Sequence, residues 1–175
     1  MGTLNLGAGA QFVGAANGLS DAPAGTIIQT AINGTTNNIT ANSDGSYADL
    51  LSLSFTPRQS NSKIIFTIMF NAYYHNGSSG TSNGASYRLL RDSTSIKEGD
   101  WCFYLHNNNY PRDFYPTLST FGFDQPNTTS AITYKLQGRK YGGNSSNFAT
   151  VFGERQISGS AVGDTIVLKL EELSV

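Results

Sequence analysis

The sequence predicts an all-β protein, an antiparallel β-sandwich of the jelly-roll type preceded by an extended N-terminal arm. Apolar and polar residues alternate with a period of two in many short segments, which is typical of strands with one buried face. Turn-forming sequences such as NSDG, DSTS and GGNSS separate these segments. No window shows the i, i+3, i+4, i+7 apolar spacing of an amphipathic helix. About nine strands at this spacing indicate a sandwich or jelly roll.

The segment KIIFTIMFNAYY, residues 63–74, is the clearest strand. Ile64, Phe66 and the following even-numbered residues form one apolar face, but Ile65 and Met69 make the opposite face apolar as well. We therefore expect this strand to be covered on both sides. The segments 130–140 and 164–173 alternate more strictly, so each predicts a strand with one solvent-facing side.

Six further segments have strand character and are bounded by turn sequences. They cover residues 26–32, 47–56, 87–93, 101–106, 117–124 and 148–158. The segment NGSSGTSNG, residues 76–84, is expected to be the most flexible loop because Gly and Ser dominate its composition.

Composition excludes several classes of protein. Charged residues make up 13% of the 175 residues, about half of the roughly 25% found in globular proteins. With a net charge of −1, electrostatic capture of nucleic acid or anionic lipid is not expected. There is one cysteine, hence no disulfide framework. No apolar run of membrane-spanning length and no signal-peptide pattern is present, so we expect folding in a cytoplasm.

Two regions are expected, an N-terminal arm or anchor at residues 1–25 and a β-sandwich domain at residues 26–175. The arm is rich in Gly, Ala and Asn and carries isolated apolar residues. Such a segment is either a flexible leader or an arm that becomes ordered on a partner subunit. The candidate anchor residues are Leu4, Leu6, Phe12 and Val13.

Several stretches, taken in order, carry a resemblance to a known family. They are GTLNLGAGAQF and APAGTIIQT near the start, FTPRQSNSKIIF, YRLLRDSTSI, DQPNTTSAITYKLQGR, and TIVLKLEELSV at the end. The chain resembles the small β-sandwich proteins and fibre-tip domains of tailed phages, especially phages of cyanobacteria and other aquatic bacteria. This resemblance implies a virion structural protein, commonly a homotrimer of jelly-roll-like sandwiches. The family includes capsid-decoration proteins, head or tail fibres and receptor-binding tips.

The same stretches have a plain physical interpretation. Pro57 cannot donate a hydrogen bond to a neighbouring strand and so ends the strand before it. Asn61 and Ser62 can close turns with their own side chains. These motifs are therefore expected to specify strand register, and none of them carries chemistry.

The sequence offers no convincing catalytic or metal-binding constellation. His75 and His106 have no ligand spacing around them, and a zinc site needs about three or four protein ligands. Cys102 is four strand residues from His106, roughly 13 Å away, too far for a catalytic pair. Glu98 and Asp100 flank Gly99 as ordinary turn residues do. We expect no enzyme activity, no metal and no cofactor.

The stretch DWCFYLHNNNYPRDFYP, residues 100–116, concentrates aromatic residues. We expect the face of Trp101, Phe103 and Leu105 to point into the core. The remaining residues are candidates for a subunit interface, where Tyr, Phe and Arg are enriched, or for a sugar-binding surface. Interface is the preferred interpretation. The candidates are Tyr104, Asn107, Asn108, Asn109, Tyr110, Arg112, Phe114 and Tyr115.

Together these inferences give one functional hypothesis and one alternative. The hypothesis is a capsid-decoration or fibre-like virion protein, a homotrimer attached to capsid or tail proteins through its arm. It is expected to be located in the virion, with assembly in the host cytoplasm. The alternative is a receptor-binding, carbohydrate-recognising module at a tail-fibre tip, with a host surface glycan as partner. Neither hypothesis involves nucleic acid or membrane insertion.

Overall fold

The computed structural model describes residues 22–40, 46–76, 81–108, 112–141, 148–157 and 160–175. These residues form strands joined by turns, and among them no helix is long and apolar enough to cross a membrane. The strands are β1 (Ile27–Thr35), β2 (Ile39–Thr40), β3 (Ala48–Phe55), β4 (Lys63–Asn76), β5 (Thr81–Arg91), β6 (Thr94–Asn108), β7 (Arg112–Phe114), β8 (Thr117–Asp124), β9 (Ile132–Tyr141), β10 (Phe148–Phe152), β11 (Glu154–Ile157), β12 (Ser160–Gly163) and β13 (Ile166–Leu173).

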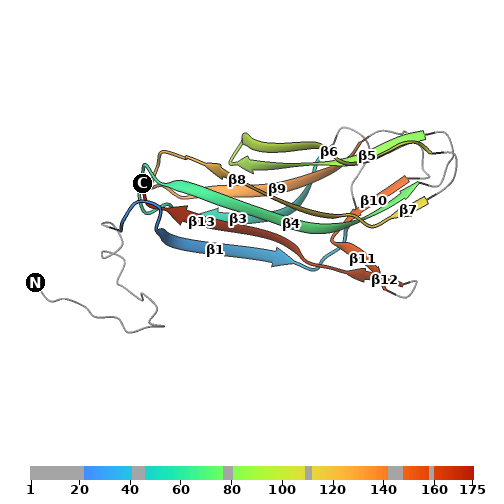
Figure 1. The fold of residues 1–175 in the computed structure, drawn as a ribbon, viewed down its shortest axis with the longest axis horizontal. Helices are drawn as coiled ribbons and strands as arrows, with labels where there is room; N and C mark the ends of the chain where they lie inside the picture. Colours follow the sequence, from blue (N-terminus) through green and yellow to red (C-terminus); the bar gives the residue numbers. More distant parts are fainter. Residues whose placement is uncertain (1–21, 41–45, 77–80, 109–111, 142–147, 158–159) are drawn as a thin grey trace, which may run out of the picture.

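Two antiparallel sheets pack face to face as a β-sandwich (Figure 1). One sheet has the order β1-β13-β4-β8 and the other the order β3-β9-β5-β6. These are the eight longest strands. If these eight strands are numbered 1 to 8 along the chain, one sheet has the order 1-8-3-6 and the other has the order 2-7-4-5. This is the jelly-roll arrangement, so the predicted fold class is confirmed.

Strand β4 is long enough to serve two sets of neighbours. Its first part pairs with β13 and β8, and its last part pairs with β10 and β7. β2 continues this end of the sheet by pairing with β10. The β11–β12 hairpin projects at the end of the molecule away from the C-terminus (Figure 1).

The core lies between the sheets and follows the alternation of the sequence. The even-numbered residues of β4 from Ile64 to Tyr74 are buried, as are Ile132, Tyr134 and Leu136 of β9. Ile166, Leu168 and Leu170 of β13 are fully buried. Aromatic side chains meet edge to face across the core, for example Phe70 of β4 and Tyr87 of β5, at 6.1 Å between ring centroids. The predictions for β9 and β13 are confirmed.

A buried carboxylate explains the turn that precedes β4. Glu172 on β13 is fully buried and accepts hydrogen bonds from the backbone N–H groups of Arg58 and Gln59 and from Ser62 Oγ, at 2.7–3.0 Å. Ser62 Oγ also lies 2.9 Å from the Gln59 carbonyl oxygen. The TPRQSNSK motif is therefore a turn held on β13 by side-chain hydrogen bonds.

Two further motifs are joined through aspartates. Asp124 accepts two hydrogen bonds from Arg91 Nη1, at 2.7 and 2.8 Å, and one from the Tyr134 hydroxyl at 2.8 Å. Asp92, with φ of 52°, donates its N–H to the Thr133 carbonyl and accepts the Thr133 N–H on Oδ1. These contacts fix β5, β8 and β9 relative to one another, as expected of motifs that specify register.

Two expectations need correction. Within the segment 76–84, residues Thr81–Gly84 belong to β5, where they pair with β6, and residues 77–80 lie outside the described part of the chain. The second face of β4 is not covered by the described part of the chain, since Met69 is 47% exposed. The apolar pattern of that face was read correctly, but no layer formed by the described residues packs on it.

Candidate functional site

The aromatic stretch is divided between β6, β7 and the segment that follows β7. Phe103 is buried, as predicted, and its ring meets Tyr74 edge to face at 6.1 Å. Cys102 and Tyr104 are half-buried. For several other candidate residues of this stretch and of the arm, the structure does not describe the residue or its side chain. Asn109, Tyr110 and the anchor candidates Leu4, Leu6, Phe12 and Val13 lie outside the described residues, and the side chains of Trp101, Leu105, Asn107, Asn108 and Arg112 are not described.

Strand β7 brings Tyr115 beside a residue that sequence reasoning did not select. β7 pairs with the end of β4, placing Phe114 opposite Tyr74 and Asp113 opposite His75. Just beyond β7, the Tyr115 ring stacks on Tyr73, with centroids 5.1 Å apart and planes 23° from parallel. The Tyr73 hydroxyl donates to Asp113 Oδ1 at 3.1 Å.

Burial and neighbouring carboxyl groups raise the pKa values of both tyrosines, so the pair stays protonated at neutral pH. Burial, followed by the bond to Asp113, raises the pKa of Tyr73 to about 12. Burial and the charges of Asp113 and Glu154 also raise the pKa of Tyr115. Glu154 is itself buried, which raises its pKa, and it accepts a hydrogen bond from Asn38 Nδ2 at 3.3 Å. The arrangement is an aromatic pair flanked by carboxyl and amide groups.

The remaining described candidates do not join this pair on one surface. Tyr104 belongs to β6 in the other sheet, opposite Gly84 in register. Phe114 is 43% exposed and pairs with Tyr74, whose side chain points inward. The structure thus groups Tyr115 with Tyr73 and Asp113. The signal for Tyr73 was present in the sequence, because the alternation in residues 63–74 puts it on the face opposite the buried residues.

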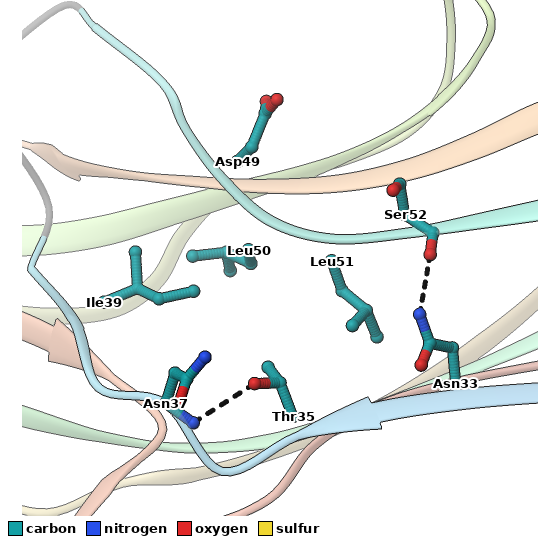
Figure 2. A pocket seen from close by; sticks show the side chains of 8 residues that line it. All are labelled: Asn33, Thr35, Asn37, Ile39, Asp49, Leu50, Leu51 and Ser52. Carbon is teal, nitrogen blue, oxygen red and sulfur yellow. Dashed lines mark hydrogen bonds between the residues drawn. The ribbon is translucent and has the colours of Figure 1, made fainter.

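A cleft opens between the edge strands β1 and β3, where the two sheets separate (Figure 2). Its volume is about 370 Å³, and its apolar lining comes from Ile39, Leu50 and Leu51. Asn33 Nδ2 closes one end by donating to the Ser52 carbonyl at 2.7 Å. Asp49 points away from the other side chains in Figure 2 and pairs with Lys135 at 3.1 Å. The cleft is therefore the open side of the sandwich, where the edge strands of the two sheets do not pair.

The outer face of the β3-β9-β5-β6 sheet is polar, and its side chains form hydrogen bonds and cation–π contacts with one another. Gln137 connects Arg88 and Asp49, accepting from Arg88 Nε at 2.7 Å and donating to Asp49 Oδ1. This bond from Gln137 is the main reason the pKa of Asp49 is lowered. The guanidinium groups of Arg88 and Arg139 lie over the Tyr47 ring, 4.0 and 4.7 Å from its centroid. This face is stabilised by contacts within the chain.

The outer face of the β1-β13-β4-β8 sheet is different, because large apolar side chains project from it into solvent. Phe121 and Phe123 on β8 are 77% and 68% exposed. Opposite them on β4 lie Thr67 and Ile65, and Met69 lies opposite Ser119. We define the β4–β8 patch as Ile65, Met69, Phe121 and Phe123.

Polar groups limit this patch on two sides. On β13, Lys169 and Glu171 form an ion pair at 2.7 Å and separate the patch from the exposed Ile32 of β1. At the far end of β4, Asn71 donates to Asp164 and accepts from Thr117 Oγ1. The patch is therefore a bounded apolar area on β4 and β8.

Groups suited to covalent or metal chemistry are not gathered in the described part of the chain. No set of three His, Cys, Asp or Glu side chains there is arranged to hold a metal ion. The thiol of Cys102 donates to the Ala85 carbonyl at 3.1 Å, and burial raises its pKa to about 12.

Similarity to known proteins was found among solved structures and not among protein-family models or curated proteins. No protein-family model matches the sequence, and no curated protein matches it. Among solved structures, the VP2 protein of infectious bursal disease virus in T=1 particles is similar, with 13% identity and a TM-score of 0.38 over 85% of this chain and 37% of that one. The VP2 subviral particle has 11% identity and a TM-score of 0.38, covering 84% and 42%.

A bacterial protein matches at a similar level. Dimeric latent PorU from Porphyromonas gingivalis has 11% identity and a TM-score of 0.34, covering 87% of this chain and 14% of that one. The chain thus spans less than half the length of each of these proteins.

Proposed function

We propose that this protein is a structural component of a tailed-phage virion, a capsid-decoration or fibre-like protein that acts as a homotrimer attached through its N-terminal arm. The observation that carries the proposal is the β4–β8 patch. A soluble domain that works alone rarely leaves two phenylalanines more than two-thirds exposed on adjacent positions of one strand face. Buried in an assembly, the same residues stabilise it.

Fold and sequence support this proposal from different directions. Jelly rolls recur in viral capsid and lectin domains, although a fold alone does not decide function. The resemblance of the motif order to tailed-phage β-sandwich proteins narrows the class. The low charge of the chain fits a protein that acts through shape, burial and hydrogen bonds.

We also propose that the protein is not an enzyme. A thiol with a pKa of about 12 is a poor nucleophile at neutral pH. Asp113 accepts a hydrogen bond from Tyr73, Glu154 accepts one from Asn38, and Asp124 pairs with Arg91. These carboxylates have structural partners.

Immunogold labelling of phage particles tests the virion assignment. Particles purified from cells infected with the phage that encodes this chain should carry the label. Particles from a phage whose copy lacks residues 1–21 should lose it, while the truncated chain stays folded in the lysate. Finding the full chain in the lysate and none on the particles would refute the assignment.

The Tyr73–Tyr115 pair supports a second candidate function, carbohydrate recognition at a fibre tip. Aromatic rings can stack on sugar rings, while Asp113 and neighbouring amides can bind hydroxyl groups. Replacing Tyr115 with Ala should then abolish binding to host cells and to glycan arrays without changing the melting temperature. A parallel loss of stability would instead make the pair a packing contact.

A further inference from the structure

We propose that copies of this chain contact one another through β8 and the outer face of β4, with Phe121 and Phe123 at the centre of the contact. This deepens the proposed function and rests on its homo-oligomeric part. It identifies which of the sheet faces and edges the neighbouring copy covers.

The outward orientation of the two phenylalanines is built into the core. A side chain on Gly122 would point inward, and its Cβ would lie 2.4 Å from the Phe66 ring. Position 122 therefore faces the core, and it has no room for a side chain because the Phe66 ring fills the space beside it. Since strand side chains alternate between faces, Phe121 and Phe123 must point outward. Turning β8 over to bury them would place large rings against Phe66.

Strand β8 is also an unprotected edge. Among the described strands, each of the two sheets of the jelly roll has two edges, namely β1 and β8, and β3 and β6. The pairings of β1, β3 and β6 each contain a register irregularity, whereas β8 pairs with β4 without one. Bulges and charges are the usual protection of edge strands against association. From Thr117 to Phe123, β8 has neither.

The charge pattern favours a second copy as the occupant. Around a symmetry axis equivalent residues approach one another, so a charged residue there would meet its own like charge. The outward residues of β8 are Thr117, Ser119, Phe121 and Phe123, and all are uncharged. Two charges on β13, Lys169 and Glu171, neutralise each other. The other nearby charge is Lys63 at the start of β4, whose ammonium group lies 5.7 Å from the centroid of the Phe123 ring.

The size of the patch and the place where the described chain begins agree with this assignment. Two largely exposed phenylalanines with Met69 and Ile65 contribute on the order of 400 Å², about half of what one partner buries in a standard interface. Polar neighbours such as Thr117 and Ser119 can supply a rim. The described chain begins beside Ser174, where Gly25 N donates to its carbonyl at 2.8 Å. The described chain thus begins at the β1 edge of the sheet, and strands β13 and β4 separate this edge from β8.

Light scattering of matched full-length variants at several concentrations tests the contact. The double variant F121S/F123S removes two exposed apolar side chains from β8, and I27S/I32S removes two from β1, the other edge of the same sheet. The first should raise the dissociation constant by about 100-fold or more, and the second should leave the mass unchanged. Thermal unfolding checks that both variants are folded.

Cross-linking gives an independent readout. Ser119→Cys places a thiol on the exposed face of β8, and Thr30→Cys places one on the exposed face of β1. Mild oxidation should link chains through residue 119 and not through residue 30. A trimer that survives F121S/F123S, or that links only through residue 30, overturns the contact and leaves the homo-oligomeric function standing.

A monomeric wild-type protein would overturn both the contact and the trimer. A dye that binds exposed apolar surfaces would then identify the occupant. Dye binding that appears only after residues 1–21 are removed would assign the patch to the arm. Dye binding to the full chain would assign it to a different protein.

Discussion

Glu172 is the residue that shows most clearly how a turn and a distant strand depend on one another. It lies on β13 yet holds the turn before β4, more than a hundred positions earlier in the chain. A buried carboxylate is stable only when hydrogen bonds replace its water. Here two backbone N–H groups and one hydroxyl do so.

Replacing Glu172 with Gln should lower the free energy of unfolding by about 2–3 kcal/mol, because hydrogen bonds to charged groups are strong and the amide N–H₂ would face backbone donors. Urea unfolding measures this. Glu171→Gln on the same strand is the control, and its partly exposed ion pair with Lys169 should contribute less than about 1 kcal/mol. Equal effects of the two changes would argue against the role assigned to Glu172.

Cys102 should behave as a buried, protonated thiol. Because burial raises its pKa from the ordinary value of 9.0 to about 12, the thiolate fraction at pH 8 is far below that of an exposed thiol. Alkylation by iodoacetamide, followed by mass spectrometry, should be at least about 100-fold slower in the native protein than in denaturant. Rapid native labelling would show that the thiol is accessible and ionised.

At the scale of elements, β8 is the strand whose sequence misleads. Its pattern TLSTFGFD offers two aromatic residues for a core, and yet both face solvent. The reason is the size of Phe66 on the neighbouring strand, which leaves room only for glycine. The orientation of β8 is set by its neighbour and not by its own hydrophobicity.

Gly122→Ala should therefore destabilise the protein by about 1–3 kcal/mol, the usual cost of overfilling a packed core. Adding Phe66→Leu should recover part of this loss, so that the double variant is more stable than the two single effects predict. Ser119→Ala, on the exposed face of the same strand, should change stability by less than about 0.5 kcal/mol. An unaffected Gly122→Ala variant would mean that β8 can turn over.

Much of the fold could be predicted from local patterns, and the failures have physical causes. Period-two alternation identified β9 and β13 and their buried residues correctly, because each has one core face. The short strands β2, β7 and β12 are too brief for a period to show. The Gly- and Ser-rich start of β5 looked like a loop because its strand character comes from pairing with β6.

The candidate site was predicted less well than the fold. Tyr115 was selected for its aromatic neighbourhood, but its stacking partner, Tyr73, comes from β4, some forty residues earlier. Only the pairing of β7 with β4 brings the two together. The β4–β8 patch could not be found by sequence alone either, since it depends on which face of β8 the core accepts.

At the scale of the whole molecule, buried tyrosines link stability to alkaline pH. Burial raises the pKa values of Tyr73, Tyr74, Tyr87 and Tyr134 above the ordinary value of 10.0. Above pH 10 the unfolded chain has lost these protons while the folded protein retains them, so unfolding becomes more favourable as pH rises. Their contribution is complete below about pH 9.

The midpoint of urea unfolding should therefore fall steadily between pH 9 and pH 11, and Tyr73→Phe should reduce the slope because it removes one titrating group. Absorbance at 295 nm reports ionisation in the same samples. A midpoint that is identical at both ends of this range would contradict the burial of these hydroxyl groups.

The central claim is that this jelly roll is a subunit of an assembly, with one outer face made for copies of itself. The most direct test is the mass of the purified full-length protein in solution, measured by light scattering across a wide range of concentrations. The mass should be three times the 18.7 kDa chain mass at every concentration. A mass of 18.7 kDa throughout would contradict it.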